Sequence, residues 1–325
     1  MKVAVGISGG VDSAVAALLL KEQGHEVVGV TMTLGRTPIV NGRGRPLSQD
    51  DEEKSLAEAR VAAERLDIPL RVFDFADEWR KQVLDYIRTT YRDGRTPNPC
   101  VRCNERVKFG LLPRAAFERL GCDRFATGHY ARLVDGRLFR AVDRSKDQSY
   151  FLYRVAPEIL ARTLFPLGEL TKAEVRARAR EFALAVADKG DSQDFCGGDV
   201  GAIIDLAARE GEIVRTDGKV LGHHAGFWNY TIGKRKGLGV GGGTPYYVVR
   251  LDAARNQVIV GTRDETICHE LRLTDTVGRI DLSLPVKVRS AGEPKRLADG
   301  LSGVAPGQSA VFYDGDEVVG GGIIV

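Results

Sequence analysis

Short apolar runs alternate with helical patterns through the first 130 residues of the chain. Apolar runs that predict strands lie at residues 2–7, 26–33, 70–75 and 124–127. Residues 13–23 are rich in Ala and Leu, and residues 52–66 repeat apolar positions at helical spacing, so both segments predict helices. This order of strands and helices is typical of an α/β fold, a doubly wound parallel sheet with helices on both faces.

Two polar, turn-rich segments follow predicted strands. Residues 35–51 carry Gly, Pro, Arg and Asn, and residues 92–108 contain Pro97 and Pro99. Both segments predict long loops, with a helix that begins near Asn104 in the second. Ligands bind to such loops at the strand ends of a doubly wound sheet.

The glycine content divides the chain near residue 204. Residues 1–204 contain 18 of the 38 glycines, and the shorter remainder, residues 205–325, contains 20. Short apolar runs between turns in this remainder predict strands at residues 219–221, 246–250, 257–260, 286–289, 310–313 and 322–325. We therefore expect an α/β domain followed by a β-rich part.

Composition and charge limit the class of protein. The chain of 325 residues is 43% hydrophobic and carries a net charge of +3, which is too small to predict nucleic-acid binding by itself. Without a run of about 20 apolar residues or a cleavable secretory pattern, we expect a cytoplasmic protein with no membrane partner. The five cysteines are Cys100, Cys103, Cys122, Cys196 and Cys268. We expect no structural disulfide framework, and we predict that Cys122 and Cys268 are buried packing residues.

The segment SGGVDS, residues 8–13, lies between the first predicted strand and the first predicted helix. Its two glycines permit unusual torsions and close approach of a ligand, and the helix N-terminus favours an anion such as phosphate. Because no lysine follows the glycines, this is not a Walker A loop. It resembles the loop of ATP pyrophosphatases, in which Asp12 would help to hold Mg²⁺. The structural alternative is a tight turn capped by Ser8, with Asp12 as an ordinary first-turn acid.

Three cysteines lie in polar segments rich in Gly or Pro. Cys100 and Cys103 lie in TPNPCVRCNERVKFG, residues 96–110, and Cys196 lies in DKGDSQDFCGGDV. A helix that begins near Asn104 would place Cys103 at its N-terminus, where the pKa of a thiol falls. These three thiols are therefore the candidates for chemistry.

Motifs along most of the chain resemble those of the bacterial tRNA-specific 2-thiouridylases. They are GISGGVDS (6–13), TPNPCVRCN (96–104), KFG (108–110), ATGHYAR (126–132), SKDQSYFLY (145–153), FPLGELTKAEVR (165–176), DSQDFC (191–196), NYTIGKRKGLGVGG (229–242) and GQSAVFYDGDEVVGGGII (307–324). Many enzymes share the pyrophosphatase loop, but SKDQSYFLY together with YTIGKRKGLG is specific to this family. The resemblance is weaker over residues 34–50 and 270–300.

This resemblance implies that ATP adenylylates the C2 carbonyl oxygen of the wobble uridine in tRNAs for Lys, Glu and Gln, and that sulfur then displaces AMP. It implies an ATP pyrophosphatase domain of the adenine nucleotide α-hydrolase type over residues 1–204. A small central β-rich domain over residues 205–270 and a C-terminal β-barrel over residues 271–325 would follow. ATP and Mg²⁺ are the implied cofactors, and the tRNA anticodon loop and an upstream sulfur-relay donor are the implied partners.

The resemblance also assigns binding residues one position at a time. The positions that match ATP-binding residues are Gly6, Ile7, Ser8, Gly9, Gly10, Val11, Asp12, Ser13, Met32 and Gly128. The positions that match tRNA-contacting residues are Asn98, Pro99, Cys100, His129, Lys146, Asp147, Gln148, Arg289, Ser290 and Gln308. Lysine and arginine at such positions suit phosphate contacts, and a wobble base must leave its stack to reach a pocket.

The roles of the cysteines also come from the resemblance. Cys196 matches the persulfide carrier, and Cys103 matches the partner thiol that would leave a Cys103–Cys196 disulfide. The chain departs from the family at Cys100, where many members carry an Asp that is proposed as general base. Either Cys100 is a substitute or bystander, or Cys100, Cys103 and Cys196 hold a [4Fe–4S] cluster with one iron open for sulfide. Both possibilities stay open at this point.

Two other functions compete with tRNA thiolation. An amidating synthetase of the ATP pyrophosphatase type would need a nitrogen-donor site and would not need Cys196. A non-enzymatic RNA-binding iron–sulfur module would bind RNA without converting ATP to AMP.

Overall fold

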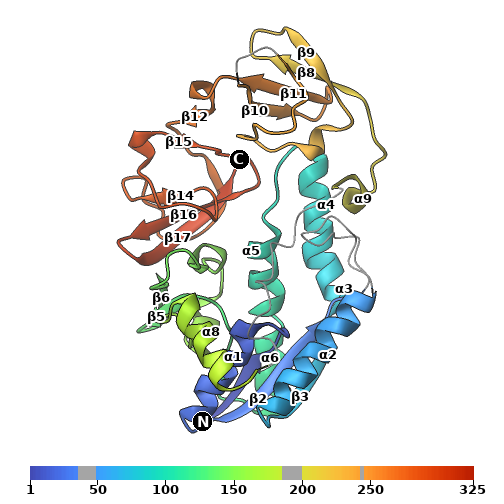
Figure 1. Ribbon diagram of the computed structural model, residues 1–325. Coiled ribbons are helices and arrows are strands. Elements are labelled where there is room, and N and C mark those ends of the chain that lie inside the picture. Colours follow the sequence, from blue (N-terminus) through green and yellow to red (C-terminus); the bar gives the residue numbers. More distant parts are fainter. Residues whose placement is uncertain (36–48, 185–199, 242–244) are drawn as a thin grey trace. The chain divides into compact units, whose positions relative to one another are not determined.

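The structure is a computed structural model that describes residues 1–35, 49–184, 200–241 and 245–325 (Figure 1). The chain forms two compact units. Unit 1 consists of Met1–Val83, Cys100–Cys196 and Gly315–Val318. Unit 2 consists of Leu84–Pro99, Gly197–Asp314 and Val319–Val325.

A parallel five-stranded sheet forms the centre of unit 1, in the order β3-β2-β1-β4-β7. Its strands are β1 (Lys2–Gly6), β2 (Glu26–Thr33), β3 (Leu70–Asp74), β4 (Arg124–Ala126) and β7 (Thr163–Leu164). The uninterrupted apolar run of β1 suits a strand that is covered on both faces. The strand order reverses direction at β1, so the predicted doubly wound sheet is confirmed, with its switch point between β1 and β4.

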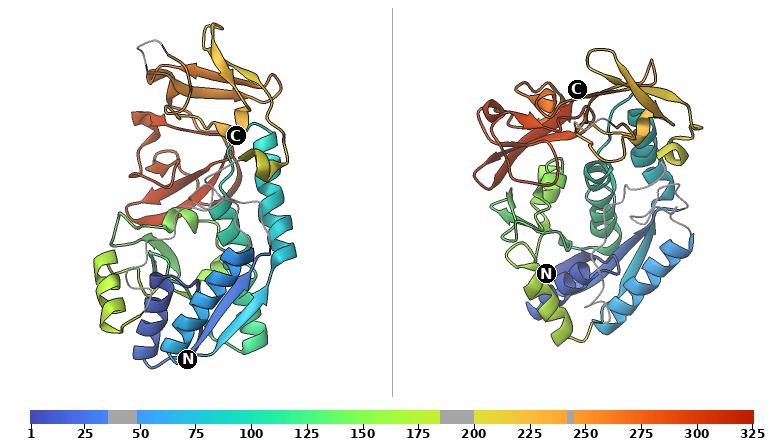
Figure 2. Two further views of the ribbon diagram at one scale, coloured as in Figure 1. Left: turned by 45° about the vertical axis from the view of Figure 1, so that its right-hand side comes forward. Right: turned by 45° about the horizontal axis from the view of Figure 1, so that its top comes forward.

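Helices cover both faces of this sheet. On one face lie α1 (Val11–Glu22), α2 (Gln49–Arg65) and α8 (Lys172–Glu181), whose buried side chains form one cluster with Val3 and Val5. Both views of Figure 2 show α2 beside β2 and β3. Ala4 lies between Val3 and Val5 on β1 and therefore points to the opposite face, as does its pairing partner Phe125. Helix α6 (Leu112–Leu120) contacts β2 and β4.

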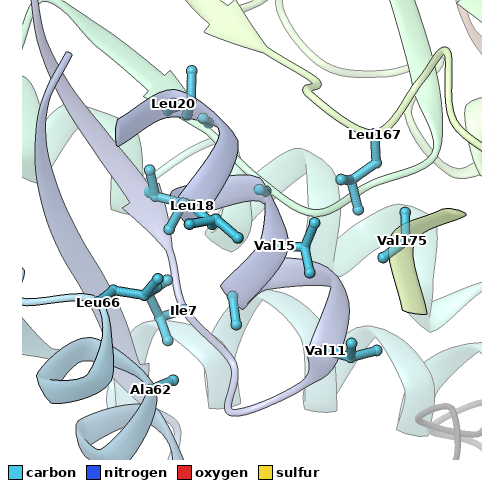
Figure 3. Close-up of a cluster of buried hydrophobic side chains, with 14 of the residues drawn as sticks. Ile7, Val11, Val15, Leu18, Leu20, Ala62, Leu66, Leu167 and Val175 are labelled. Carbon is cyan, nitrogen blue, oxygen red and sulfur yellow. The ribbon is translucent and has the colours of Figure 1, made fainter. Parts of the chain in front are cut away.

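Helix α1 is buried on nearly all sides. Its Val15 and Leu18 lie among Ile7 of the loop after β1, Leu66 at the end of α2, and Leu167 (Figure 3). Ala and Leu are strong helix formers, and a helix that is apolar around its circumference belongs inside a domain. This packing fixes where the N-terminus of α1 points.

The remaining elements of unit 1 are short. They are α3 (Ala76–Trp79), the π-helical turns η1 (Arg80–Leu84) and η2 (Asn104–Lys108), α5 (Pro99–Cys103), β5 (Ala131–Val134), β6 (Arg137–Arg140), η3 (Ser149–Phe151) and α7 (Pro157–Leu160). The single boundary residues Leu84 and Pro99 of η1 and α5 belong to unit 2. The antiparallel hairpin of β5 and β6 pairs with the first residue of β17, Glu317.

Unit 2 is rich in β-strands. Its elements are α4 (Asp85–Arg92), α9 (Val200–Ile204), β8 (Gly211–Arg215), β9 (Val220–His224), η4 (Phe227–Asn229), β10 (Tyr247–Asp252), β11 (Gln257–Gly261), η5 (Asp264–Thr266), β12 (Ile267–Cys268), β13 (Leu273–Gly278), β14 (Val286–Lys287), η6 (Leu297–Asp299), β15 (Leu301–Ser302), β16 (Ser309–Asp314) and most of β17 (Glu317–Ile324). One sheet has the order β10-β11-β8-β9. In the second, β14 pairs with β16 and β13 pairs with β17 around Val286, Phe312 and Ile324. Each of the six strands predicted for this part overlaps an observed strand.

Two local predictions are wrong. Residues 49–51, predicted as loop, already belong to α2, whereas residues 36–48 lie outside the described ranges. The segment predicted as irregular up to Lys108 contains α5, so the helical stretch begins at Pro99 and not near Asn104. Proline suits the first position of a helix because its missing N–H would have no helical partner there.

Within the described ranges, no helix combines the length and the apolar character needed to cross a membrane.

We expect Leu18→Ala to lower the free energy of unfolding by about 2–5 kcal/mol, because it leaves a cavity between α1 and the sheet. Val61→Ala on α2 is the matched control, since Val61 is 51% exposed and should cost well under about 1 kcal/mol. Urea denaturation followed by circular dichroism measures both. Equal losses for the two variants would contradict the central place of α1.

Candidate functional site

The loop after β1 forms a compact turn at the N-terminus of α1. The Ser8 amide donates to Ser13 Oγ at 3.2 Å, and Ser13 Oγ donates to the Gly10 carbonyl at 3.0 Å. Gly9 has φ +73°, and a Cβ at Gly9 would lie 2.7 Å from Glu58 Cβ of α2. Gly10 is the N-cap of α1 in an extended conformation, so of these two glycines only Gly9 takes the expected unusual torsion. The structural alternative of a turn in which Ser8 caps the helix is not observed, because Gly10 is the N-cap and no side chain caps the helix.

Gly128 brings the loop after β4 against the first turn of α1. A Cβ at Gly128 would lie 2.6 Å from the carbonyl carbon of Asp12 and 2.7 Å from the Ser13 amide nitrogen, so only glycine fits. The loops after β1 and β4 therefore meet at the switch point of the sheet, where doubly wound folds bind ligands. Met32 lies near the end of the neighbouring strand β2. The structure thus gathers most of the predicted ATP-binding positions at one edge.

A lysine from distant sequence holds the acid of this loop. Lys172 Nζ lies 2.7 Å from Asp12 Oδ1 and 2.8 Å from Asp12 Oδ2, and the Tyr130 hydroxyl donates to Asp12 Oδ1 at 2.8 Å. The Lys172 side chain is 12% exposed. It lies at the first position of α8, whose N-cap Thr171 forms a capping box with Glu174. The SGGVDS loop contains no lysine, but the fold places Lys172 beside it.

Sequence analysis did not single out Lys172 or Tyr130, although both lie in quoted motifs. The spacing from Thr171 to Glu174 signals a helix start, and so it marks where Lys172 stands on α8. The spacing does not show that Lys172 contacts Asp12, because the two residues are 160 positions apart in the sequence and only the fold brings them together.

Cys100 and Cys103 lie one helical turn apart on α5, and both are partly exposed cysteines. Burial raises the pKa of the Cys103 thiol above its ordinary value of 9.0, and the Lys108 charge and a hydrogen bond from Trp79 offset only part of this rise. The predicted low pKa of Cys103 is therefore wrong. Cys103 is the last residue of α5 and also the N-cap of η2, and its helical torsions (φ −65°, ψ −42°) place it inside a continuing helical stretch and not in the first turn of one.

The arginines near Cys103 contribute less positive charge at its thiol than their number suggests, because they pair with a carboxylate. Arg102 Nη1 and Arg154 Nε lie 3.1 Å and 3.2 Å from the Glu105 carboxylate, and Arg106 Nη2 lies 3.4 Å from it. Glu105 thus balances much of this charge, which leaves Lys108 as the basic residue that acts on Cys103.

His129 lies at the end of the β4 loop among aromatic rings. Its ring centroid is 5.5 Å from that of Phe109 and 6.2 Å from that of Phe165, and its Nδ1 shares a hydrogen bond of 2.8 Å with Thr127 Oγ1. Burial, aided by the charge of Lys108, lowers the pKa of His129 to about 3. A neutral imidazole can exchange hydrogen bonds with RNA but cannot pair with phosphate as a cation.

The predicted tRNA-contacting run of residues 146–148 contains two structural side chains. Asp147 is 1% exposed and accepts the Ala141 amide at 3.1 Å, and Gln148 Oε1 accepts the Tyr130 amide at 2.9 Å. Lys146 is partly exposed. Contact of residues 146–148 with tRNA stays a prediction. Of the three side chains, the partly exposed Lys146 is the one best suited to contact tRNA.

The predicted tRNA contacts in unit 2 hold neighbouring backbone. Arg289 donates to the carbonyls of Ile232 and Gly303 at 2.9 Å each, and it thereby anchors the loop that carries YTIGKRKGLG. Gln308 Nε2 donates to the Pro97 carbonyl at 2.5 Å. Ser290 is exposed beside Arg289.

Cys196 lies outside the described residues. Among the residues that are described, no group of three or more His, Cys, Asp or Glu side chains is arranged to hold a metal ion. Cys122 is buried as predicted, whereas Cys268 is only partly buried. The disulfide and the cluster that involve Cys196 therefore stay predictions.

Comparison with known proteins decides the family. A tRNA-specific 2-thiouridylase of Trichormus variabilis is 44% identical over 359 residues, covering 99% of this chain and 98% of that protein. One of Picosynechococcus is 45% identical over 355 residues, with the same coverage. The chain belongs to the tRNA-specific 2-thiouridylase family.

Family profiles agree with this membership. The profile described as tRNA methyl transferase HUP domain matches residues 1–197, that of the PRC-barrel domain residues 204–262, and that of an aminomethyltransferase β-barrel domain residues 294–324. The predicted fold class, a nucleotide-binding α/β domain followed by two β-rich domains, is confirmed, and so is the sulfurtransferase class. The boundaries 1–204, 205–270 and 271–325 stay predictions.

A solved structure is similar at a greater distance. A 4-thiouridine synthetase in complex with RNA and ATP is 20% identical, with a TM-score of 0.39, over 60% of this chain and 44% of that chain.

We expect Cys103 to react slowly with iodoacetamide at neutral pH, because its raised pKa keeps the thiol protonated. Below that pKa the thiolate fraction, and hence the rate, should rise about tenfold per pH unit from pH 7 to pH 9. Peptide mass spectrometry follows the modification of Cys103, with a cysteine-containing peptide as the reference thiol. A rate that stays constant from pH 6 to pH 8 would indicate a thiolate and contradict the prediction.

We expect Lys172→Met to weaken the binding of Mg·ATP about 10- to 100-fold, the range for loss of a charge-assisted hydrogen bond. Lys172→Arg keeps the charge and should retain much of the affinity. Isothermal titration calorimetry measures both, with Lys54→Met on the exposed side of α2 as the matched control. Wild-type affinity in Lys172→Met would show that Lys172 only stabilises Asp12 in the unliganded protein.

Proposed function

We propose that this protein uses ATP to convert the wobble uridine of tRNAs for Lys, Glu and Gln to 2-thiouridine. The observation that carries this proposal is near-full-length identity of 42–45% to 2-thiouridylases, in a chain whose SGGVDS loop stands at the switch point of a doubly wound sheet. The cytoplasm is the compartment that we propose for this reaction.

The loop residues suit the activation step. The C2 carbonyl oxygen of uridine would attack the α-phosphorus of ATP, giving the adenylated base and pyrophosphate. The first amides of α1, the hydroxyls of Ser8 and Ser13, and the Lys172 ammonium would hold the departing pyrophosphate, whose negative charge they balance. Gly128 lets the loop after β4 pack directly against this turn, because a Cβ there would collide with the backbone of Asp12 and Ser13.

Asp12 is the loop residue that would hold Mg²⁺. A magnesium ion at ATP is commonly bound through one or two carboxylates and the phosphates, and the partly exposed Asp12 carboxylate fits this role. The ion would supply charge neutralisation of the phosphates. Lys172 would stay as the second cation near them and contact the phosphate oxygens.

Sulfur would reach C2 by one of two routes, and both use Cys103 and Cys196. In the first, the terminal sulfur of a Cys196 persulfide attacks C2 and AMP leaves; the Cys103 thiolate then attacks the Cys196 sulfur, which releases 2-thiouridine and leaves a disulfide for an external dithiol to reduce. The Cys103 proton must leave first, which the raised pKa opposes.

In the second route, a [4Fe–4S] cluster would supply sulfide at an open iron. The spacing of Cys100 and Cys103 on one helical turn fits two of the three ligands, and Cys196 would be the third. Iron content separates the two routes. An upstream sulfur-relay protein would charge the enzyme in either case.

The proposed tRNA contacts are Asn98, Pro99, Cys100, His129, Lys146, Asp147, Gln148, Arg289, Ser290 and Gln308. Asn98 to Cys100 would meet the target base, which must leave its stack in the anticodon loop. Lys146 would contact phosphate.

We expect purified protein with ATP, Mg²⁺ and a persulfide or sulfide donor to form 2-thiouridine in an unmodified tRNA transcript. Retardation in a mercury-containing gel detects the product. Cys196→Ala should abolish it, and Cys268→Ser, which changes a thiol assigned no role, should not. A tRNA with cytidine at the wobble position is the substrate control.

Five results would overturn parts of this proposal. ATP-independent product, or Cys196→Ala with wild-type activity, would contradict the reaction. RNA binding without conversion of ATP to AMP would favour a non-enzymatic RNA-binding module, and amide formation from a nitrogen donor would favour an amidating synthetase. Activity of iron-free protein with a persulfide donor would exclude a required cluster.

A further inference from the structure

The segment that matches the target-base contact folds with the C-terminal strands. Residues Leu84–Pro99 belong to unit 2, whereas Cys100 and Cys103 belong to unit 1. Thr96, Pro97 and Asn98 are buried. The backbone of this segment is therefore fixed by contacts that the sequence motif does not contain.

The turn of residues 305–308, between β15 and β16, supplies two of these contacts. The Thr96 amide donates to the Pro306 carbonyl at 2.8 Å. Gln308 Nε2 donates to the carbonyls of Pro97 at 2.5 Å and Thr96 at 3.3 Å. A proline cannot donate a backbone hydrogen bond, so the carbonyl of Pro97 is the group through which its peptide can be held.

Gly307 allows the close approach of the two segments. It has φ +90°, and a Cβ there would lie 2.7 Å from the Thr96 carbonyl oxygen and 3.0 Å from Thr90 Cγ2. The Gly307 amide donates to the Ile324 carbonyl at 2.8 Å, which ties the turn to β17. The turn is thus a fixed part of the second sheet.

Tyr86 on α4 joins the turn to the segment. Its hydroxyl accepts the Asn98 amide at 3.1 Å and donates to the Gly307 carbonyl at 3.4 Å. One phenol therefore connects the backbone of Asn98 to the same turn that holds Thr96 and Pro97.

We propose that Tyr86 and the turn of residues 305–308 are positioning elements for thiolation, which set the backbone of Asn98 where the target base is received. This inference rests on the proposed function. It gives Gln308 a role inside the protein beside, or in place of, the tRNA contact that the family resemblance implies. Tyr86 acts through Asn98 and touches no reacting atom.

The two roles predict different kinetics. A residue that only contacts tRNA changes the dissociation constant of tRNA and leaves the single-turnover rate at saturating tRNA unchanged. A positioning residue lowers the rate of the bound complex and leaves the dissociation constant nearly unchanged.

Tyr86→Phe in the full-length protein tests the inference, because it removes one hydroxyl and keeps the ring. We expect a single-turnover thiolation rate about 3- to 10-fold lower, the range for one neutral hydrogen bond, with tRNA affinity within about twofold of wild type. Amide hydrogen exchange at Asn98, whose amide donates to the Tyr86 hydroxyl, should be faster. Tyr247→Phe on β10 is the matched control for loss of a tyrosine hydroxyl in unit 2.

Gly307→Ala provides a second variant, with Gly218→Ala as its control. Both glycines have φ near +90°, but nothing lies within 4 Å of a Cβ at Gly218. The two substitutions therefore carry the same backbone strain, and only Gly307→Ala pushes residues 95–96 from the turn. We expect a loss of rate more than tenfold beyond that of Gly218→Ala, measured at temperatures where both proteins are folded.

Each other outcome overturns the inference. Unchanged hydrogen exchange in Tyr86→Phe would show that the hydroxyl does not hold Asn98. Faster exchange with an unchanged rate would remove the positioning role, and weaker tRNA binding with an unchanged rate would make Tyr86 part of the tRNA-binding surface. An inactive wild-type protein would reject the proposed function itself, whereas an active wild type beside an equally active Tyr86→Phe rejects the positioning role alone.

Discussion

The close approach of Gly128 to the first turn of α1 is the contact on which the geometry of the SGGVDS loop and the proposed nucleotide site depends. It is possible because α1 is apolar around its circumference and packs against Ile7, Leu66 and Leu167 at once. A helix held on several sides cannot turn its N-terminus away, so its free amides stay aimed at the switch point of the sheet. The packing of α1 in the interior thereby fixes the direction in which its N-terminal amides point.

The ion pair of Asp12 and Lys172 is a second consequence of the packing around α1. Helix α8 packs against α1, and its capping box places Lys172 at the turn beside Asp12. An unpaired carboxylate at an anion site would repel phosphate, but the ammonium of Lys172 contacts both oxygens of the partly exposed Asp12 and balances that charge. The unliganded loop is therefore close to neutral and leaves the helix amides as its net attraction for an anion.

Much of the fold follows from local pattern, and much of the site does not. Runs such as KVAVG predict strands because both sides of a parallel strand are buried, and the β-α-β-α order then determines the sheet. Helix α5 is not evident from the sequence because Pro97 and Pro99 resemble a loop, although Pro99 at the first helical position is compatible with a helix. The pKa of Cys103 was predicted in the wrong direction because burial of the thiol depends on tertiary packing. Pairing of Glu105 with the neighbouring Arg102 and the distant Arg154 also reduces the local positive charge.

The junction between Pro99 and Cys100 connects two differently held groups. Asn98 takes its position from Tyr86 and Thr96 from the turn at Pro306, whereas the thiol of Cys103 takes its environment from Trp79 and Lys108. Consecutive Cα atoms are about 3.8 Å apart, and the ring of Pro99 fixes its φ at the start of α5. Few torsions remain to absorb a displacement between them. In the proposed reaction, the backbone that would receive the base at Asn98 and the helix that carries Cys103 are therefore joined by a short covalent link.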